Sequence, residues 1–506
     1  MYNELKLPVE QQFLLPCDMM EWLPEDSLAY TIFHIVSTMD LSEFYAKYRK
    51  DGIGGKFLDP AIKLSIFYYA YCTGVFSSRK IEEKIHYDIG FRVLARNQSI
   101  DHTTLARFRQ EFKEPIAENF KHVLKILEDA GAIKAGEIAL DGTKIKANAS
   151  MEKNKAYNSI RREIDRILEE SQRIDEEEDK LYGKDNGYEE LPGLPKNKVE
   201  RFELLNKIKE EIEAEQKEKA TEQEEKIKAR DEDEKVNGKR RGRKPKPPQY
   251  EPGEKEKRNT TDPESRIMKS RNGLIQGYNG QVVASENQYI VAHDVVNDQN
   301  DRYQLEPMLF KAIENLRHIN ENKDILPKRI LADAGYWAYE SLLSLGSTGV
   351  DILVSPRNEH KFSEVYEYSR IILDMDDFCR STHPAPCRAL IQHVATWVLN
   401  TYCKLDEEVT GSKEILKQIM GKKVAESSRH IYSRRKVEVE PVFAQIKTNM
   451  SFNKFSMRGK DNSKAEWALV CTAYNIKKGW MNGMFSNLSQ TVRSILENST
   501  QKTSVC

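Results

Sequence analysis

The chain has 506 residues, with 79 Lys and Arg against 80 Asp and Glu, which gives a formal net charge of −1. At roughly 100–200 residues per domain, this length predicts three or four domains. The balanced charge excludes a uniformly basic packaging protein, so any nucleic-acid contact must come from local basic patches. Because no long uncharged apolar run and no N-terminal export pattern are found, we expect a cytoplasmic protein without a membrane span. The seven cysteines form no CxxC pair and fit free thiols.

Residues 1–133 are predicted to form an all-helical domain. Apolar residues recur every three or four positions in four segments, at 27–39, 60–76, 77–85 and 101–112. The last segment opens with Asp101 and two threonines, which are good helix caps, and we expect it to present Arg107 and Arg109. Two interpretations remain open: a DNA-binding or oligomerisation module, or a helical bundle with no nucleic-acid role.

An alternating, strand-type pattern begins at residue 137 and is soon interrupted. Residues 134–150 are predicted to start an α/β core that continues at 262–361 and 429–485, because strand and helix patterns alternate there. The interruption at 151–236 is charge-rich and predicts a helical hairpin with a weak coiled-coil seam. Its apolar stripes are Ile160, Ile164, Ile167, Ile174 and Leu181, and then Leu205, Ile208 and Ile212.

A basic linker follows at 237–261. Six of the eight residues from Lys239 to Lys246 are basic, and such a segment cannot fold alone. Arg241, Gly242 and Arg243 resemble the arm of an AT-hook, in which glycine lets the backbone sit deep in a narrow minor groove. A nonspecific phosphate-binding or solubilising linker is the open alternative.

Three carboxylates lie where separate elements could build one site. Asp141 lies in a predicted strand, Asp333 ends another strand, and Glu440 lies in a basic, helical segment. Carboxylates brought together bind divalent cations, and two such ions can promote in-line phosphoryl transfer. Because the chain has 80 acidic residues, spacing alone makes this triplet one candidate among many.

Neighbouring charged residues leave alternatives. Glu438 is a second candidate for the third carboxylate, although a strand or a helix would point it differently from Glu440. We expect Asp294, Asp298 and Asp301 to be strand-end and capping residues. A group of three basic residues has two equally good interpretations, as phosphate contacts or as a basic loop in water. These residues are Arg266, Lys269 and Arg271.

Three blocks of residues raise the carboxylate triplet above the others. The segments ALDGTK at 139–144 and LADAGY at 331–336, and a block with Tyr432, Arg435, Lys436, Glu440 and Lys447, resemble the catalytic blocks of bacterial insertion-sequence DDE transposases. Other segments are also similar to that family, at 57–85, 100–109, 262–279, 297–309 and 468–478.

The resemblance implies an α/β fold, with an RNase H-like mixed sheet flanked by helices, an all-α N-terminal domain and a helical charged insertion. By position, Asp141, Asp333 and Glu440 would be catalytic and would bind two Mg²⁺, with Mn²⁺ as a substitute. The DNA backbone would be supported by Tyr432, Arg435, Lys436 and Lys447.

The resemblance also implies partners. These are double-stranded DNA, at the terminal inverted repeats of the element and at the target, and a second copy or more of the chain. The protein would act in the cytoplasm at the nucleoid, with the charged hairpin at 151–236 as a pairing surface.

Local geometry around Glu440 makes two predictions. A regular helix would place Glu440 and Lys447, seven residues apart, on one face two turns apart. Pro441 disfavours helical geometry at the preceding residue, so the helix is expected to begin or kink at Glu440.

Residues 362–428 depart from the family, and 486–506 form a tail. The part at 362–403 holds no lysine but three of the seven cysteines. A zinc site there would lack the usual knuckle spacing; its candidates are Cys379, Cys387, Cys403, His383 and His393. A shifted reading frame or a divergent replacement would explain this composition. The rival function is then a catalytically inactive DNA-binding remnant or regulator, while a coiled-coil scaffold would explain only 151–236.

Overall fold

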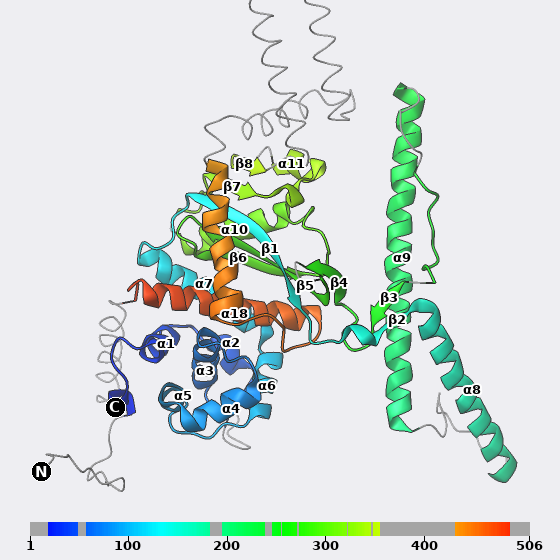
Figure 1. The fold of residues 1–506 in the computed structure, drawn as a ribbon, viewed down its shortest axis with the longest axis horizontal. Coiled ribbons are helices and arrows are strands. Elements are labelled where there is room, and N and C mark those ends of the chain that lie inside the picture. The colour runs from blue at the N-terminus through cyan, green and yellow to red at the C-terminus, as the bar shows by residue number, and fades with distance from the viewer. Residues whose placement is uncertain are drawn as a thin grey trace, which may run out of the picture. The chain divides into compact units, whose positions relative to one another are not determined.

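The computed structural model describes residues 19–48, 57–182, 195–237, 245–254, 256–270, 273–320, 322–345, 348–354 and 431–485. The chain divides into two compact units. The first unit holds residues 1–145, 279–457 and 461–506, and the second holds 146–278 and 458–460 (Figure 1).

The first unit begins with helices. They are η1 (Met19–Trp22), α1 (Leu28–Ser37), α2 (Ser42–Ala46), α3 (Pro60–Cys72), α4 (Ser78–Tyr87), α5 (Ile89–Leu94), α6 (His102–Glu111) and α7 (Lys113–Asp129). The four predicted helical segments are confirmed, and Asp101 caps α6 by accepting from the N–H groups of Thr103 and Thr104. Nearly all of α3 is buried, so this helix forms the centre of the module.

Arg109 lies inside the protein, and the prediction that α6 presents it is wrong. Only 6% of the residue is exposed, whereas Arg107 lies on the surface. Leu105, Phe108 and Arg109 are spaced i, i+3, i+4, which places all three on the buried face of α6. The apolar neighbours on this face were therefore the signal that the arginine is internal.

A mixed sheet of five strands forms the core of the first unit. The strands are β1 (Glu137–Lys146), β5 (Gly273–Ser285), β6 (Ile290–Val296), β7 (Arg329–Ala332) and β8 (Asp351–Val354). Their order is β6-β5-β1-β7-β8, with β5 and β6 antiparallel and β1, β7 and β8 parallel. Taken in chain order, this is the arrangement 3-2-1-4-5. The predicted fold class, an RNase H-like α/β core, is confirmed.

Helices cover this sheet. They are α10 (Leu305–Ile319), α11 (Tyr339–Leu345), α16 (Arg435–Glu438), α17 (Glu440–Ala444), a π-helix (Gln445–Asn449) and α18 (Lys460–Met481), with a 3₁₀ turn η3 (Ala334–Tyr336) after β7. The predicted helices at 302–318, 339–345 and 464–480 are confirmed.

The helix α18 lies between the sheet and the N-terminal helices (Figure 1). On the sheet side, the Asn475 amide exchanges two hydrogen bonds with the backbone of Ile290, and Trp467 Nε1 donates to the Gln281 carbonyl. On the other side, Cys72 of α3 donates to the Ala473 carbonyl. The N-terminal module and the core therefore share one packed interior.

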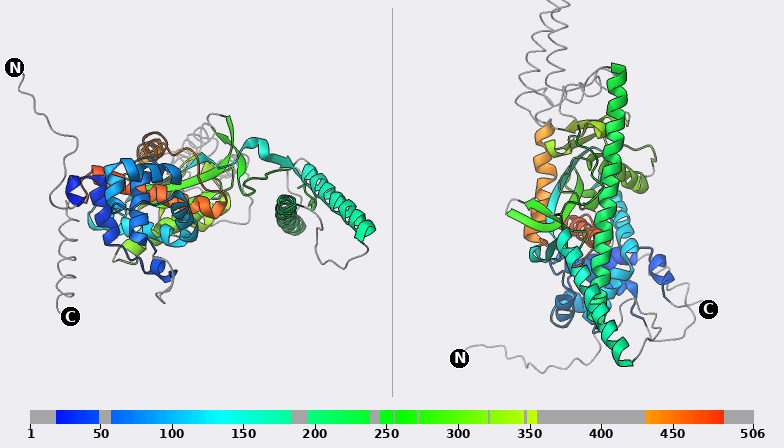
Figure 2. Two further views of the ribbon diagram at one scale, coloured as in Figure 1. Left: turned by 90° about the horizontal axis from the view of Figure 1, so that it is seen from below. Right: turned by 90° about the vertical axis from the view of Figure 1, so that its right-hand side faces the viewer.

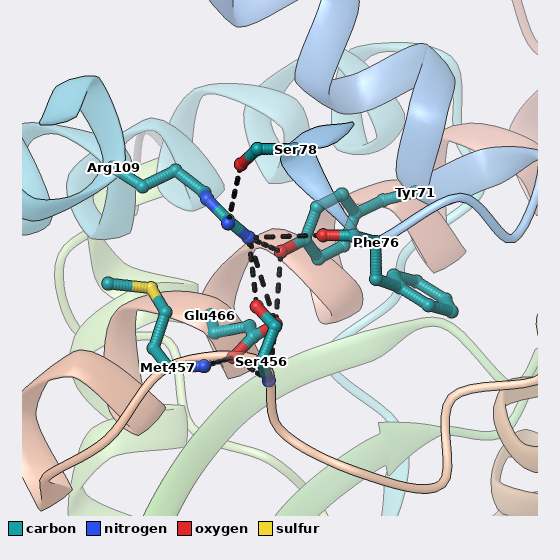
Figure 3. Close-up of polar contacts among 7 residues, drawn as sticks. All are labelled: Tyr71, Phe76, Ser78, Arg109, Ser456, Met457 and Glu466. Atoms are coloured by element: carbon teal, nitrogen blue, oxygen red, sulfur yellow. Dashed lines mark hydrogen bonds and ion pairs between the residues drawn. The ribbon is translucent and has the colours of Figure 1, made fainter. Parts of the chain in front are cut away.

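A buried ion pair joins α6 to α18 (Figure 3). The Arg109 Nη1 lies 3.8 Å from Glu466 Oε1, and both side chains are less than a tenth exposed. The Arg109 guanidinium also donates to Tyr71, Ser78 and Ser456. Glu466 accepts from Ser456 and from the Met457 N–H. Because nearly every polar atom of the pair is satisfied inside the protein, these contacts fix the N-terminal module against the core helix.

The second unit is built on a helical hairpin, as predicted. The helices α8 (Tyr157–Tyr182) and α9 (Lys196–Asn237) pack side by side, and Figure 2 shows α9 nearly end-on in its left view. The buried side chains between them include six of the predicted stripe residues together with Tyr157: Ile160, Ile164, Ile167, Leu205, Ile208 and Ile212. Ile174 is only half-buried, so the seam extends along part of α8.

Short strands complete the second unit. The strand β2 (Asn154–Ala156), which follows the turn η2 (Met151–Lys153), pairs antiparallel with β3 (Lys257–Asn259), and β4 (Arg266–Ser270) pairs with the first residues of β5. Strand β4 was not predicted. Within it, Arg266 forms an ion pair with Glu215 of α9 (2.7 Å), so the interpretation of Arg266 as part of a basic loop in water is wrong.

Candidate active site

The sheet register places Asp141 and Asp333 side by side. Ala139 of β1 pairs with Leu331 of β7, and each aspartate lies two residues further along its strand direction. Because the strands are parallel neighbours, residues at the same distance from a paired position lie at the same level of the sheet. Two of the predicted catalytic residues therefore come from adjacent strands.

Asp141 is largely buried and carries a perturbed carboxyl group. Its Oδ1 accepts from the N–H of Gly142 (2.8 Å), and its Oδ2 lies 3.2 Å from Arg435 Nη1. The pKa of Asp141 is raised to about 6, mainly by burial and to a smaller extent by the charges of Asp333 and Asp301, while Arg435 and the Gly142 N–H oppose the rise. Arg435 and the Gly142 N–H thus balance only part of the negative charge around Asp141.

Asp333 ends β7 and caps the turn η3. Its Oδ1 accepts from the Gly335 N–H (2.8 Å). A Cβ at residue 335 would lie 2.9 Å from this same oxygen, so the close approach needs glycine. The Gly335 backbone thereby fixes the orientation of the Asp333 carboxylate.

Glu440 is linked to Asp141 through Arg435. The Arg435 guanidinium lies 3.5 Å from Glu440 Oε1 and 3.2 Å from Asp141 Oδ2, so it bridges the late helix and the first strand. The helix α17 begins at Glu440, as Pro441 predicted, and a turn at Val439 separates it from α16. Glu440 lies at the more exposed edge of the group, with 47% of its side chain accessible.

The other predicted DNA-binding residues fall in three places. Lys436 is exposed, and Tyr432 is half-buried. Lys447 Nζ donates to the Lys144 carbonyl of β1 (3.2 Å). The AT-hook-like residues Arg241, Gly242 and Arg243 lie outside the described residues, as do the cysteine and histidine candidates of 362–403.

The regular helix predicted between Glu440 and Lys447 is wrong in part. The chain is α-helical only to Ala444 and then forms a π-helix over Gln445–Asn449. A π-helix closes i→i+5 hydrogen bonds and so turns less per residue than an α-helix. Lys447 is therefore rotated relative to the α-helical position above Glu440, and it contacts β1 instead.

Sequence reasoning missed a polar group beneath the carboxylates. Asp301 accepts hydrogen bonds from Asn279 (2.6 Å) and Gln281 (2.8 Å), and Gln281 accepts from the Tyr336 hydroxyl (2.5 Å). Asp301 was predicted to be a capping residue. The available signal was that both its own segment, 297–309, and that of Asn279, 262–279, resemble the family.

Glu438 points away from this group. Only 2% of the residue is exposed, and its carboxylate lies 3.3 Å from Arg434 Nε. Arg434 also pairs with Glu137 at the start of β1 and with Glu286. This second cluster anchors α16 to the opposite end of β1 from Asp141, so the two acidic residues of the segment serve different surroundings.

The Glu438 cluster predicts a pH dependence of stability. Burial raises the pKa of Glu438 from 4.5 to about 7. Between these values the folded protein holds a proton that the unfolded chain has lost, so stability decreases as pH rises through this window. Glutamine does not titrate. We therefore expect Glu438→Gln to gain about 2–3 kcal/mol relative to the unsubstituted protein between pH 5 and pH 8. Denaturant unfolding at both pH values measures this, and a pH-independent difference would contradict it.

The donor set suits a hard divalent cation, although the side chains do not already enclose one. Within the described ranges, no group of three His, Cys, Asp or Glu side chains is placed to hold a metal ion. Carboxylate oxygens are the ligands that Mg²⁺ and Mn²⁺ prefer. Asp333 and Asp301 lie close enough to Asp141 for their charges to raise its pKa. A bound cation would neutralise this excess of negative charge. The carboxylates present are therefore chemically suited to binding Mg²⁺ or Mn²⁺.

A mixed sheet with carboxylates on adjacent strands and a glutamate on a late helix defines the class of RNase H-like proteins with a DDE triplet. Residues 404–480 match the family described as Transposase DDE domain, and residues 18–111 match the family described as Transposase domain (DUF772). Two parts of the chain therefore match transposase domains, and the C-terminal one is of the DDE type. No significant match was found among curated proteins or among solved structures.

Each of the two matched regions supplies one residue of the buried ion pair. Arg109 lies in the first matched region and Glu466 in the second, so the two transposase domains are in direct contact through α6 and α18. None of the helices in the described part of the chain is long and apolar enough to cross a membrane.

Proposed function

We propose that this transposase binds the inverted ends of its element, cleaves a phosphodiester there and joins the resulting 3′ hydroxyl to target DNA. The observation that supports this most strongly is the convergence of β1, the β7 end and α17. Asp141, Asp333 and Glu440 come from segments 192 and 107 residues apart. Asp141 and Asp333 lie at the same level of adjacent strands, and the Arg435 guanidinium bridges Asp141 and Glu440.

Asp141, Asp333 and Glu440 would hold two Mg²⁺ in this proposal. Such ions, when bound, supply activation of an attacking oxygen and neutralisation of charge on the leaving oxygen. In their absence, Arg435 is the cation between Asp141 and Glu440. Cations held by these carboxylates would compete with the Arg435 guanidinium, and an Arg435 released from Asp141 and Glu440 would be available to a DNA phosphate.

Basic residues near the carboxylates would hold the DNA strand. Lys436 is exposed one residue beyond Arg435, and Tyr432 and Lys447 lie in the same C-terminal segment. Charged contacts of this kind position a phosphate backbone without reading its sequence. We assign minor-groove contact to Arg241, Gly242 and Arg243 on the basis of their sequence alone.

The domain limits and the assembly belong to the same proposal. Residues 1–133 would form the N-terminal DNA-binding or oligomerisation domain, 134–150, 262–361 and 429–485 the catalytic core, and 237–261 a basic linker. The hairpin of α8 and α9 would pair two copies of the chain, because two element ends must be held together. A homodimer or larger assembly on DNA is the expected state.

Cleavage of a labelled duplex carrying the element's own end tests the proposal. The protein is incubated with Mg²⁺, with Mn²⁺ and with a chelator, and strand nicking and strand joining are followed on denaturing gels. We expect nicking at the element boundary with either cation and none with the chelator, and an unrelated duplex of equal length serves as the control. Specific binding without nicking under every condition would instead establish the inactive remnant or regulator.

A further inference from the structure

The loop between β6 and α10 brings a fourth carboxylate, Asp301, against the predicted catalytic residues. The Asp301 side chain is one-quarter exposed. Its Oδ1 accepts from Asn279 Nδ2 (2.6 Å), Gln281 Nε2 (2.8 Å) and Lys144 Nζ (3.3 Å). A carboxylate oxygen has about two lone-pair sites, so three donors leave this oxygen fully engaged.

The donors to Asp301 come from the two central strands. Asn279 and Gln281 lie on β5 with spacing i, i+2, so both point to the same face, and both are fully buried. Lys144 lies on β1, three residues after Asp141. Asp301 therefore ties the loop before α10 to the strand that carries a predicted catalytic residue.

Asp301 also packs against the glycines that follow Asp141 in β1 and Asp333 in the turn η3. A Cβ at residue 142 would lie 2.5 Å from Gln281 Nε2 and 2.8 Å from Asp301 Oδ1. A Cβ at residue 335 would lie 3.9 Å from Asp301 Cβ. The two glycines thus leave the space that the Asp301 carboxylate and its partners occupy.

Two further hydrogen bonds extend this network to the remaining predicted catalytic elements. Tyr336, three residues after Asp333, donates to Gln281 Oε1 (2.5 Å). Lys447, in the π-helix that follows Glu440, donates to the backbone carbonyl of Lys144 (3.2 Å). From Asp301, one path through Gln281 reaches the Asp333 turn, and another through Lys144 reaches the late helix.

From this geometry we propose that Asp301 is a positioning residue for strand cleavage, which holds Lys144, the Asp141 segment of β1 and the Asp333 turn in register. This rests on the proposed function. Asp301 acts through other residues and binds neither cation nor phosphate itself. When a residue that orients a metal ligand is lost, metal affinity or activity typically decreases by about 10–100-fold. A charged partner is needed because Lys144 is only 16% exposed and would otherwise keep an uncompensated ammonium.

The test compares Asp301→Asn with the matched control Asp298→Asn in the end-cleavage assay. Asp298 lies in the same loop, and its carboxylate accepts from Gln304 (3.0 Å), away from Lys144. For Asp301→Asn we expect kcat to decrease by about 30–100-fold while KM for end DNA changes less than about twofold. For Asp298→Asn we expect both constants to stay near those of the unsubstituted protein. A loss of packing alone would instead lower stability and DNA binding together.

Lys144→Met provides a second route to the same result if Asp301→Asn folds poorly. Asp301→Asn and Lys144→Met should be strongly non-additive in kcat, because both break the same contact. Mn²⁺ binding, measured by calorimetry, should weaken by about 10-fold in each variant, which is a readout independent of turnover.

Three results would overturn the inference. The first is an Asp301→Asn kcat within threefold of the unsubstituted rate. The second is additive effects of the Asp301 and Lys144 replacements. The third is an absence of cleavage by the unsubstituted protein, which would overturn the proposed function as well. The first two leave the proposed function intact, so the two failures are distinguishable.

Discussion

Replacing Arg109 by methionine is expected to lower the apparent free energy of unfolding of the first unit by about 3–5 kcal/mol. Methionine keeps much of the aliphatic length and removes the guanidinium. The carboxylate of Glu466, which is fully buried, would then retain its hydrogen-bond donors but lose its only ion-pair partner recorded in the described part of the chain. A buried charge without its counter-charge is among the costliest defects in a protein interior.

Chemical denaturation of single and double variants measures this effect. In the native protein, the Glu466 carboxylate accepts from several donors, including the N–H of Met457 (3.1 Å). Glu466→Gln replaces one of its oxygens by an amide NH₂ group, which is itself a donor and cannot accept from them. In the double variant Arg109→Met with Glu466→Gln, the loss should be smaller than the sum of the two single losses, by about 1–3 kcal/mol.

The surface arginine of the same helix is the control for the buried pair. Arg107→Met removes an equal charge two residues away, from an exposed position, and should change stability by no more than about 0.5 kcal/mol. Equal losses for Arg107→Met and Arg109→Met would show that charge reduction, rather than the buried pair, is responsible.

The order of strands and helices could be predicted from the sequence because each element shows its own hydrophobic period. The parallel strands β7 and β8 are short and apolar, and α10 and α18 show helical spacing, so their limits were found within a few residues. The strand β4 lacks such a pattern. Its residues RIMKS are half-buried polar and apolar side chains, and only pairing with β5 identifies them as a strand.

The candidate site was predictable where the backbone determines it and not where side chains from distant segments meet. Asp141 and Asp333 fall at the same level because parallel strands align them, which a strand pattern implies. The Arg435 bridge and the Asp301 network depend on contacts across 294 and 157 residues of sequence. No local pattern encodes such distances, so Asp301 was interpreted from its neighbours as a cap.

Asp141→Asn is expected to reduce strand cleavage by at least about a thousand-fold, with binding to the element end retained. A cation that loses one carboxylate ligand forfeits several kcal/mol of transition-state stabilisation, and about 4 kcal/mol corresponds to a factor of a thousand. Asparagine preserves the shape of the side chain and can still accept from the Gly142 N–H, so the fold of β1 should be kept. Cleavage by Asp141→Asn at the unsubstituted rate would contradict the assignment of Asp141.

The same assay separates Glu440 from its neighbour Glu438. Glu440→Gln should lose activity to a similar extent as Asp141→Asn, because Glu440 shares Arg435 with Asp141. Glu438→Gln should retain cleavage within about threefold at neutral pH, since Glu438 faces Arg434, which keeps Glu137 and Glu286 as partners. The reverse ranking would identify Glu438 as the third carboxylate and would require α16 to rotate when DNA binds. Activity of both variants would mean that the late helix supplies no ligand, leaving Asp141 and Asp333 to act with a carboxylate from another segment.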